Sequence, residues 1–181
     1  MRCFWGLDKS LAYARHFPAI NWLTSYSLYQ DKVDEWADKN VDVHFSEQRT
    51  LAMRLLQTEA ELQEIVQLVG VDSLSHSDRL ILETSRSIRE DFLHQNSFHE
   101  IDTYTSLEKQ HYMMKLVLAF YDEGAEALSR GAQVNDLVKL PVREKIGRYK
   151  YTEESNLTAE YEAVDKELSA EIAGLLGKED L

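Results

Sequence analysis

The sequence predicts an all-α protein, an antiparallel helical bundle with a short strand and loop strap at its N-terminus. Apolar residues recur at the three-and-four spacing of a helix face over four long stretches. A hydroxyl residue followed three positions later by an acid precedes two of these stretches. Only residues 1–27 depart from the pattern. A chain of 181 residues is long enough to bury the core of such a bundle.

The first 27 residues are expected to form strand and loop. Phe4–Gly6 is typical of a strand that runs into a turn, and Phe17 precedes Pro18, which disfavours helix at the residue before it. A short amphipathic segment follows around Val33 and Trp36. We therefore expect a boundary near residue 27, with a helical domain over residues 28–181.

The first two long helices form a pair. The first ends at Gly70, where a left-handed C-terminal cap is expected. A turn over residues 71–76 separates it from a second helix, which Ser75 and Asp78 introduce with a pattern that resembles a capping box. The stripes expected to be buried are Leu51, Leu55, Leu62, Ile65 and Val69 in the first helix, and Ile81, Ile88 and Phe92 in the second.

Two further long helices complete the bundle. Thr105 and Glu108 repeat the capping pattern before a third helix that ends near Gly131, and Gly124 weakens its last turns by about 1 kcal/mol relative to alanine. Pro141 then interrupts the pattern. The apolar faces are Met114, Val117 and Tyr121 in the third helix, and Leu157, Tyr161, Val164, Leu168, Ile172 and Leu175 in the last.

Composition narrows the class of function. The net charge of -12 opposes binding to nucleic acid or to anionic lipid. A single cysteine, Cys3, excludes an internal disulfide and a thiolate zinc cage. No apolar run approaches the ~20 residues of a membrane span, and the N-terminus lacks the order of a signal peptide. We expect a cytoplasmic protein with no nucleic-acid partner and no direct membrane insertion.

The sequence contains no motif for catalysis, and we expect no catalytic residue in it. The glycine-rich phosphate loop of nucleotide hydrolases is absent, because the one Gly-Lys pair, Gly177-Lys178, is followed by Glu179. His99-Glu100 lacks the second histidine of a zinc protease motif. A Ser-His-Asp site stays open without support, since such sites assemble across a fold.

A two-metal site inside the bundle is a distant alternative. Glu108 with His111 fits the Glu-x-x-His motif of such sites, and Asp91 with His94 fits it loosely. Pairs of this kind arise often by chance in a chain with 32 acids and 6 histidines. We interpret them as surface pairs and expect no metal.

Several segments resemble, in the same order, the catalytic A subunit of V-type and archaeal-type rotary ATPases. They are Phe4–Asp8 (FWGLD), Arg15–Ser27 (RHFPAINWLTSYS), Glu59–Gly70 (EAELQEIVQLVG), Ile88–Leu93 (IREDFL) with Gln95-Asn96, Phe98–Glu100 (FHE) and Leu140–Ile146 (LPVREKI). The resemblance covers essentially all of this chain and only the last third or so of such a subunit.

The resemblance implies a division of the chain. Residues 1–27 correspond to the terminal edge of a nucleotide-binding domain, and residues 28–181 to the C-terminal helical domain. The phosphate loop, the catalytic glutamate and the magnesium-binding positions of the family are expected before Met1, so this chain alone is expected to be inactive. The intact subunit would use ATP or ADP with Mg. We expect none bound here, because stacking contributes roughly 1 to 3 kcal/mol and millimolar affinity requires about 4 kcal/mol.

The resemblance also implies two sites. The family holds the adenine ring between aromatic residues, which here match Phe17 and Phe98, with Gln95 and Ser97 lining the base and Tyr104 at its border. The alternative makes these aromatics ordinary core residues. The second site is the turn that faces the central stalk of the rotary enzyme, whose alternative is a plain capped helix turn. It consists of Asp72, Ser73, Leu74, Ser75, His76, Ser77 and Asp78.

The implied function is a share in a proton- or sodium-transporting ATP synthase, an ATP-binding hydrolase and translocase peripheral to the membrane. The implied partners are the N-terminal part of the A subunit, the B subunit in an alternating hexameric ring, and the central stalk subunits. The alternative from another class is a stand-alone, non-catalytic helical module that binds partner subunits.

Overall fold

The computed structural model describes residues 2–179, and side chains through Gly177. Met1 and residues 180–181, which the expected domains include, lie outside it. The chain begins with a hairpin of β1 (Cys3–Leu7) and β2 (Ile20–Ser27), with the short helix α1 (Lys9–Tyr13) between them. The remaining helices are α2 (Gln30–Asn40), α3 (Phe45–Val69), α4 (His76–Ser87), α5 (Leu107–Ser129), α6 (Val134–Leu137), α7 (Val142–Arg148) and α8 (Leu157–Glu179).

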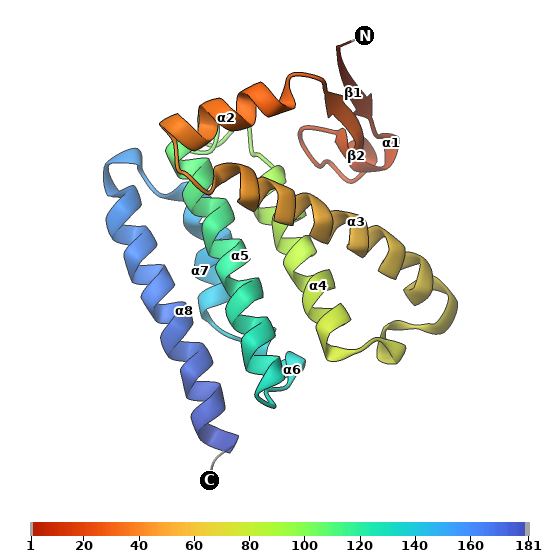
Figure 1. Ribbon diagram of the computed structural model, residues 1–181, viewed down its shortest axis with the longest axis vertical. Coiled ribbons are helices and arrows are strands. Elements are labelled where there is room, and N and C mark those ends of the chain that lie inside the picture. The colour runs from red at the N-terminus through yellow and green to blue at the C-terminus, as the bar shows by residue number, and fades with distance from the viewer. Residues whose placement is uncertain (1, 180–181) are drawn as a thin grey trace.

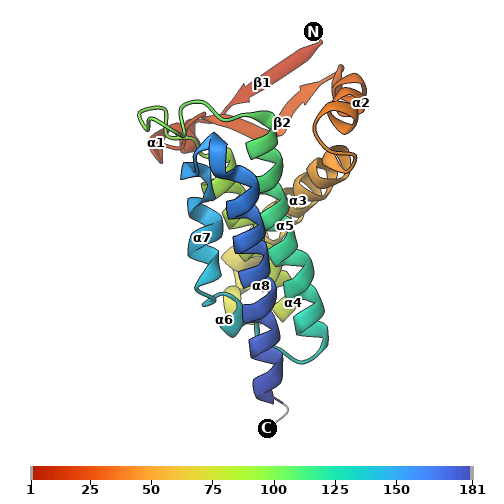
Figure 2. The same cartoon turned by 90° about the vertical axis from the view of Figure 1, so that its left-hand side faces the viewer.

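The predicted fold class is confirmed: the chain is an all-α bundle with a short strand element at its N-terminus (Figure 1). α4 and α5 run in opposite directions along the bundle. α6 and α7 bring the chain back, so α5 and α8 pack side by side in the same direction (Figures 1 and 2). α3 and α4 form a splayed pair whose far end projects from the bundle (Figure 1).

The N-terminal hairpin, which we use for β1, α1 and β2 together, contains an element that the sequence analysis missed. α1 begins at Asp8, whose carboxylate accepts hydrogen bonds from the backbone N–H groups of Ser10 and Leu11. Such side-chain caps satisfy donors that the first turn of a helix leaves free. β1 and β2 pair antiparallel with a shift in register between Phe4 and Gly6.

The core is centred on α5, which is surrounded by α3, α4, α7 and α8. Leu116, Val117 and Phe120 of α5 are at most 2% exposed. The predicted apolar face of α8 is confirmed, because Leu157, Val164, Leu168 and Ile172 are buried, with Tyr161 and Leu175 partly buried beside them. Helices with one apolar face are stabilised chiefly by burying it against such neighbours.

The helix caps were predicted with mixed success. Ser75 caps α4 as expected, since its Oγ accepts from the Asp78 N–H at 3.1 Å and donates to the Asp78 carboxylate at 2.7 Å. The Thr105 cap is wrong, because Ser106 accepts from the Lys109 N–H at 3.0 Å. Gly70 has the expected positive φ of 84°, but its ψ of 159° lies outside the left-handed helical region. A short 3-10 turn, η1 (Val71–Ser73), follows it.

Two predicted apolar faces are less buried than expected. Val33 and Trp36 are 56% and 52% exposed, because the buried residue of α2 is Ala37 instead. Ile65 and Val69 are 45% and 62% exposed, since the end of α3 extends past the part that its neighbours cover. The second predicted stripe also changes geometry: α4 ends at Ser87, and a π-helical turn, η2 (Ile88–Leu93), carries Ile88 and Phe92.

Within residues 2–179, no helix combines the length and the apolarity needed to cross a lipid bilayer.

Candidate functional site at the junction of hairpin and bundle

The structure places the loop between η2 and α5 beside the N-terminal hairpin (Figure 2). This loop, residues 94–106, carries Gln95, Ser97, Phe98 and Tyr104 of the predicted adenine pocket. The Gln95 N–H donates to the Phe17 carbonyl at 2.7 Å, and the Phe17 N–H donates to Nδ1 of His94 at 3.1 Å. Two segments far apart in sequence are therefore joined at the predicted pocket residue Phe17.

Hydrogen bonds inside the loop hold its shape. The Asp102 carboxylate, on a residue only 2% exposed, accepts from the Asn96 N–H at 2.6 Å. The side-chain amide of Gln95 donates to the Asp102 carbonyl at 2.7 Å, and the Thr103 hydroxyl donates to the Ser97 carbonyl at 2.9 Å. The Gln95 amide nitrogen therefore braces the loop in this chain. Asp102 is a residue that sequence reasoning missed, because nothing in its spacing signals the contact.

The predicted pocket aromatics lie on the surface of this chain. Phe98 is 98% exposed, Tyr104 84% and Phe17 51%. The alternative that made Phe17 and Phe98 ordinary core residues is therefore wrong for the part of the chain that the structure describes. Among the described ring pairs, none joins Phe17 with Phe98, so the two rings form no closed sandwich here. Their contact with a nucleotide stays a prediction.

Two histidines support this junction, and sequence reasoning assigned neither of them to it. Nε2 of His16 lies 2.9 Å from the Arg89 carbonyl and Nδ1 lies 3.3 Å from the Pro18 carbonyl. The rings of His16 and His94 have centroids 5.0 Å apart. Burial is the main cause that lowers the pKa of His94, and the nearby Lys150 and His16 lower it further.

Local backbone geometry brings His16 to this place. Arg15 has a positive φ of 57°, and the His16 N–H donates to the Leu11 carbonyl at 2.9 Å. The Arg15 N–H donates to the Ala12 carbonyl at 3.1 Å, which completes the hydrogen-bond pattern of a Schellman helix end. The left-handed residue turns the chain sharply after α1, so the next side chain, His16, reaches Arg89 in η2.

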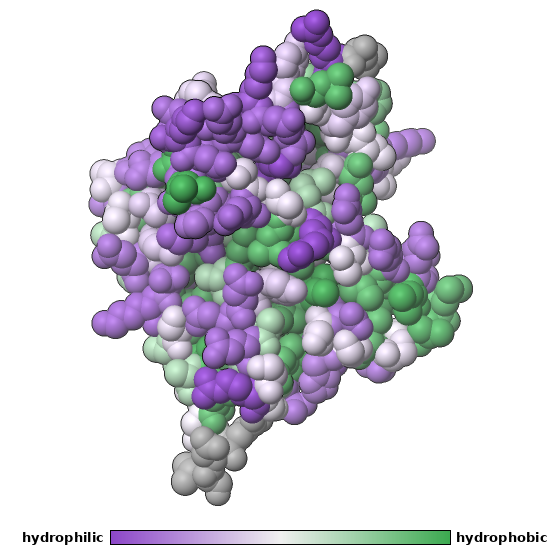
Figure 3. Space-filling view, viewed as in Figure 1, coloured by the Kyte–Doolittle hydropathy of each residue, from purple (hydrophilic) through white to green (hydrophobic). Residues whose placement is uncertain are grey.

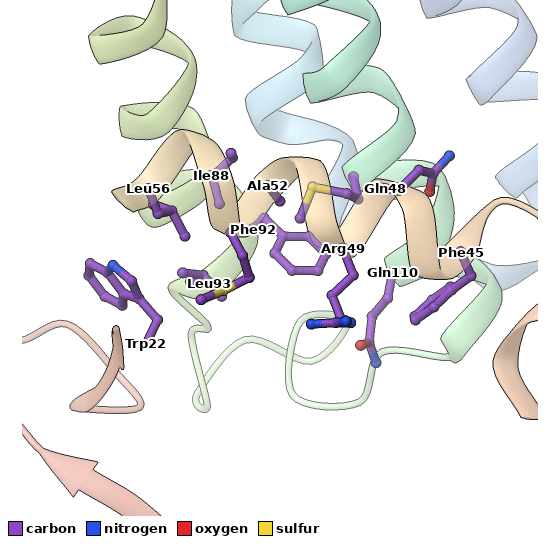
Figure 4. A pocket seen from close by; sticks show the side chains of 12 residues that line it. Trp22, Phe45, Gln48, Arg49, Ala52, Leu56, Ile88, Phe92, Leu93 and Gln110 are labelled. Carbon is purple, nitrogen blue, oxygen red and sulfur yellow. The ribbon is translucent and has the colours of Figure 1, made fainter. Parts of the chain in front are cut away.

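An apolar cavity of about 250 Å³ lies under the same junction (Figure 4). Trp22 of β2 closes one side, and side chains of α3, η2 and α5 form the rest. Phe17 and Phe98 do not line it. It is lined by Trp22, Phe45, Gln48, Arg49, Ala52, Met53, Leu56, Ile88, Phe92, Leu93, Gln110 and Met114. The Arg49 guanidinium at the cavity is paired with Asp34, whose carboxylate lies 2.8 Å from Nη2.

The turn predicted to face a central stalk lies at the projecting end of α3 and α4. It runs from η1 into the first turn of α4, and only Leu74 and Asp78 are half-buried in it. Apolar side chains gather beside it on the molecular surface, of which Leu68 is 85% exposed and Val71 43% (Figure 3). Leu68 was not predicted to belong to this surface. Its signal was an apolar residue outside the predicted stripe and next to a turn.

The candidate metal pairs do not form a cluster. Within the described residues, no group of three or more His, Cys, Asp or Glu side chains is placed to hold a metal ion. The prediction that His111 lies on the surface is wrong, because His111 is only 5% exposed. Its Nε2 lies 3.6 Å from the Asp42 carboxylate. Burial lowers the pKa of His111 despite that carboxylate.

Comparison with known proteins gives a consistent result. Residues 34–138 match the family model described as the C-terminal domain of V and A type ATP synthase. The V-type ATP synthase alpha chain of Clostridioides difficile is 65% identical over 98% of this chain. Its counterparts in Acetivibrio thermocellus and Thermoanaerobacter pseudethanolicus are 57% and 58% identical over 99% and 97% of this chain. The chain spans 30% of the length of each of these relatives.

Proposed function

The chain belongs to the family of C-terminal domains of V and A type ATP synthases, and on this premise we propose that it serves the catalytic alpha chain in two ways. The junction contributes aromatic residues to the adenine pocket, and the projecting end of α3 and α4 faces the central stalk. The assembled enzyme then couples ATP synthesis or hydrolysis to transport of protons or sodium ions. In this proposal the chain works at the cytoplasmic face and is attached to the membrane through the complex.

One observation carries the nucleotide role. The Gln95–Phe17 backbone hydrogen bond of 2.7 Å ties the hairpin to the loop that presents Phe98 and Tyr104. The exposure of Phe98 and Tyr104 leaves both rings accessible to a planar ligand. A purine ring stacked on them would be held at a point where residues 1–27, as the edge of the nucleotide-binding domain, meet residues 28–181.

The proposed partners follow from this placement. The N-terminal part of the alpha chain would supply the phosphate and magnesium contacts, with ATP or ADP and Mg bound between the two parts. The B subunit would alternate with it in a hexameric ring. Nucleotide occupancy can shift the helical domain only if the contacts at the junction differ between the occupied and empty states.

The test of the nucleotide role is Phe98→Ala in the longer alpha chain within the assembled enzyme. A lost stack of roughly 1 to 3 kcal/mol corresponds to a KM for ATP raised about 5- to 150-fold. Phe98→Trp should keep the affinity. Tyr13→Ala is the matched control, because Tyr13 is 76% exposed and lies on α1. An unchanged KM for Phe98→Ala together with Phe17→Ala would refute the pocket.

The stalk-facing role has its own test. Leu74→Asp and Leu68→Asp should reduce ATP-driven ion transport more than ATP affinity, because both lie at the projecting end and away from the junction. Val43→Asp is the matched control, since Val43 is 68% exposed before α3. Equal loss of transport and affinity in the tip variants would contradict the role, and so would an equal loss of transport in the control.

A further inference from the structure

The His16–His94 pair is a link between hairpin and bundle that the proposed function does not use. His16 follows α1, and His94 ends the π-helical turn η2. Their ring centroids are 5.0 Å apart. Both rings bond to backbone groups of residues 17–18 or of Arg89 in η2, so they lie where the hairpin is attached to the bundle.

His94 and the next residue hold both backbone polar groups of Phe17. The Phe17 N–H donates to Nδ1 of His94 at 3.1 Å, and the Phe17 carbonyl accepts from the Gln95 N–H at 2.7 Å. A ring nitrogen that accepts carries no proton, so the neutral His94 ring has its proton on Nε2. If Nδ1 takes up a proton, it becomes a donor, and two donors then face each other.

His16 faces acceptors with both of its nitrogens. Nε2 lies 2.9 Å from the Arg89 carbonyl and Nδ1 lies 3.3 Å from the Pro18 carbonyl. A neutral ring can donate to one of these carbonyls, and a protonated ring can donate to both. A second positive charge on His94, one ring away, would repel a protonated His16.

The charged groups that act on His94 are Lys150, Asp102 and Glu90. The Lys150 ammonium donates to the His94 carbonyl at 3.0 Å from the turn η3 (Tyr149–Tyr151). Burial, Lys150 and His16 lower the pKa of His94, whereas Asp102 in the loop and Glu90 in η2 raise it less. Neutral His94 is therefore the form present at neutral pH, and acid converts it.

We propose that His94 is the positioning residue of Phe17, and that proton uptake at His94 breaks its bond to the Phe17 N–H and loosens the attachment of Phe17 to the bundle. The proposal gives Phe17 a ligand only through the proposed function; the contact between His94 and Phe17 stands without it. Its consequence is an acid-sensitive attachment between the hairpin and the helical domain.

The test is nuclear magnetic resonance of the full chain labelled with nitrogen-15. Long-range spectra should show His94 as the tautomer with its proton on Nε2. On acidification the Phe17 amide proton should move upfield with the same midpoint as the His94 ring. In His94→Asn, whose Oδ1 accepts in place of Nδ1 without titrating, this amide should lose its pH dependence. In His94→Ala it should exchange with solvent faster at every pH.

A surface histidine provides the control. His44→Asn should leave the Phe17 titration unchanged, because His44 pairs with Glu47 on exposed surface. A His94 ring with its proton on Nδ1, or a Phe17 amide that titrates unchanged in His94→Asn, would overturn the proposal. The tautomer is measured on the unmodified chain, so it decides the matter even if a variant does not fold.

Failure of this inference is distinct from failure of the proposed function. A Phe17 amide that follows His94, with Phe17→Ala and Phe98→Ala leaving ATP affinity unchanged in the longer subunit, supports the positioning and refutes the pocket. ATP affinity that depends on Phe17, with a Phe17 amide indifferent to His94, supports the pocket and overturns the positioning.

Discussion

Glu59 offers a sharp test of what a buried ion pair contributes to this bundle. Glu59 is only 6% exposed on α3, and its carboxylate accepts hydrogen bonds from the Arg89 guanidinium at 2.9, 3.1 and 3.2 Å. The Arg89 side chain keeps 28% exposure to solvent. The perturbation is Glu59→Gln, which removes the negative charge and keeps the shape, beside Glu59→Ala, which removes both.

The structure decides the magnitude. Breaking a fully buried pair costs about 3 to 5 kcal/mol, but burial raises the pKa of Glu59 in spite of the attraction of Arg89. The negative charge as such therefore adds no net stability. Glutamine still offers an oxygen to a partly hydrated guanidinium, so we expect Glu59→Gln to cost about 1 kcal/mol. Glu59→Ala loses every contact and should cost about 3 kcal/mol.

The pH dependence carries a definite sign. Because the pKa of Glu59 is raised above 4.5 in the fold, the folded chain takes up this proton at a higher pH than the unfolded chain. The free energy of unfolding of the wild type should therefore rise relative to Glu59→Gln as pH falls through the folded-state pKa toward 4.5. The other acids titrate in both chains and cancel in the difference.

The assay is urea unfolding followed by far-ultraviolet circular dichroism, at neutral pH and at about pH 5. Equal slopes against urea are required before the midpoints are compared. The reasoning is refuted if Glu59→Gln costs as much as Glu59→Ala, or if the gap between wild type and Glu59→Gln narrows in acid. Either result would mean that the charge itself stabilises the fold.

Three further outcomes are expected. Hydrogen bonds from the Ser10 hydroxyl, the Asn21 amide and the Ser10 N–H lower the pKa of Asp8 from 3.8 to about 2. The stability that they add to the hairpin is present above pH 3.8 and should be lost as the pH falls through about 2. Amide shifts of Ser10 that still titrate this way in Asp8→Asn would contradict this expectation. Gly124→Leu should lower the free energy of unfolding, measured in urea, by about 1 to 3 kcal/mol, because a Cβ added at Gly124 would lie only 3.3 Å from the Leu80 side chain. Gly124→Ala should be near neutral, since about 1 kcal/mol of helix propensity offsets that contact. Tyr149→Phe should cost about 1 kcal/mol, since the buried Tyr149 hydroxyl donates to the Leu157 carbonyl at 2.8 Å; an unchanged unfolding midpoint would show that this bond adds nothing.

Periodicity and caps predicted much of the fold. The α8 stripe from Leu157 to Ile172 is buried as expected because one helix face has one partner surface. Ser75 caps α4 because its bond to Asp78 is local and visible in the spacing. Val33 and Val69 were misjudged for the opposite reason: their burial depends on whether another helix reaches them, which no local pattern records.

The candidate site was predictable only in part. The resemblance placed Phe17 and Gln95 in one pocket, and their backbones are hydrogen bonded. The role of His94 could not be predicted from local sequence, because it depends on a fold that brings residue 16 next to residue 94. The brace from Asp102 was missed for the same reason, since a carboxylate that accepts a loop N–H has no sequence signature.

The overhang of α3 determines how force would travel through the domain. No residue of α3 is buried beyond Leu62, so its last seven residues reach about 10 Å past the seam that anchors it. A sideways load on that end would turn α3 about its last buried turn, which contains Glu59 and Leu62. The Arg89 that grips Glu59 there also offers its carbonyl to His16. A tilt of α3 would thus be transmitted through Arg89 to its hydrogen bond with His16, the residue before Phe17.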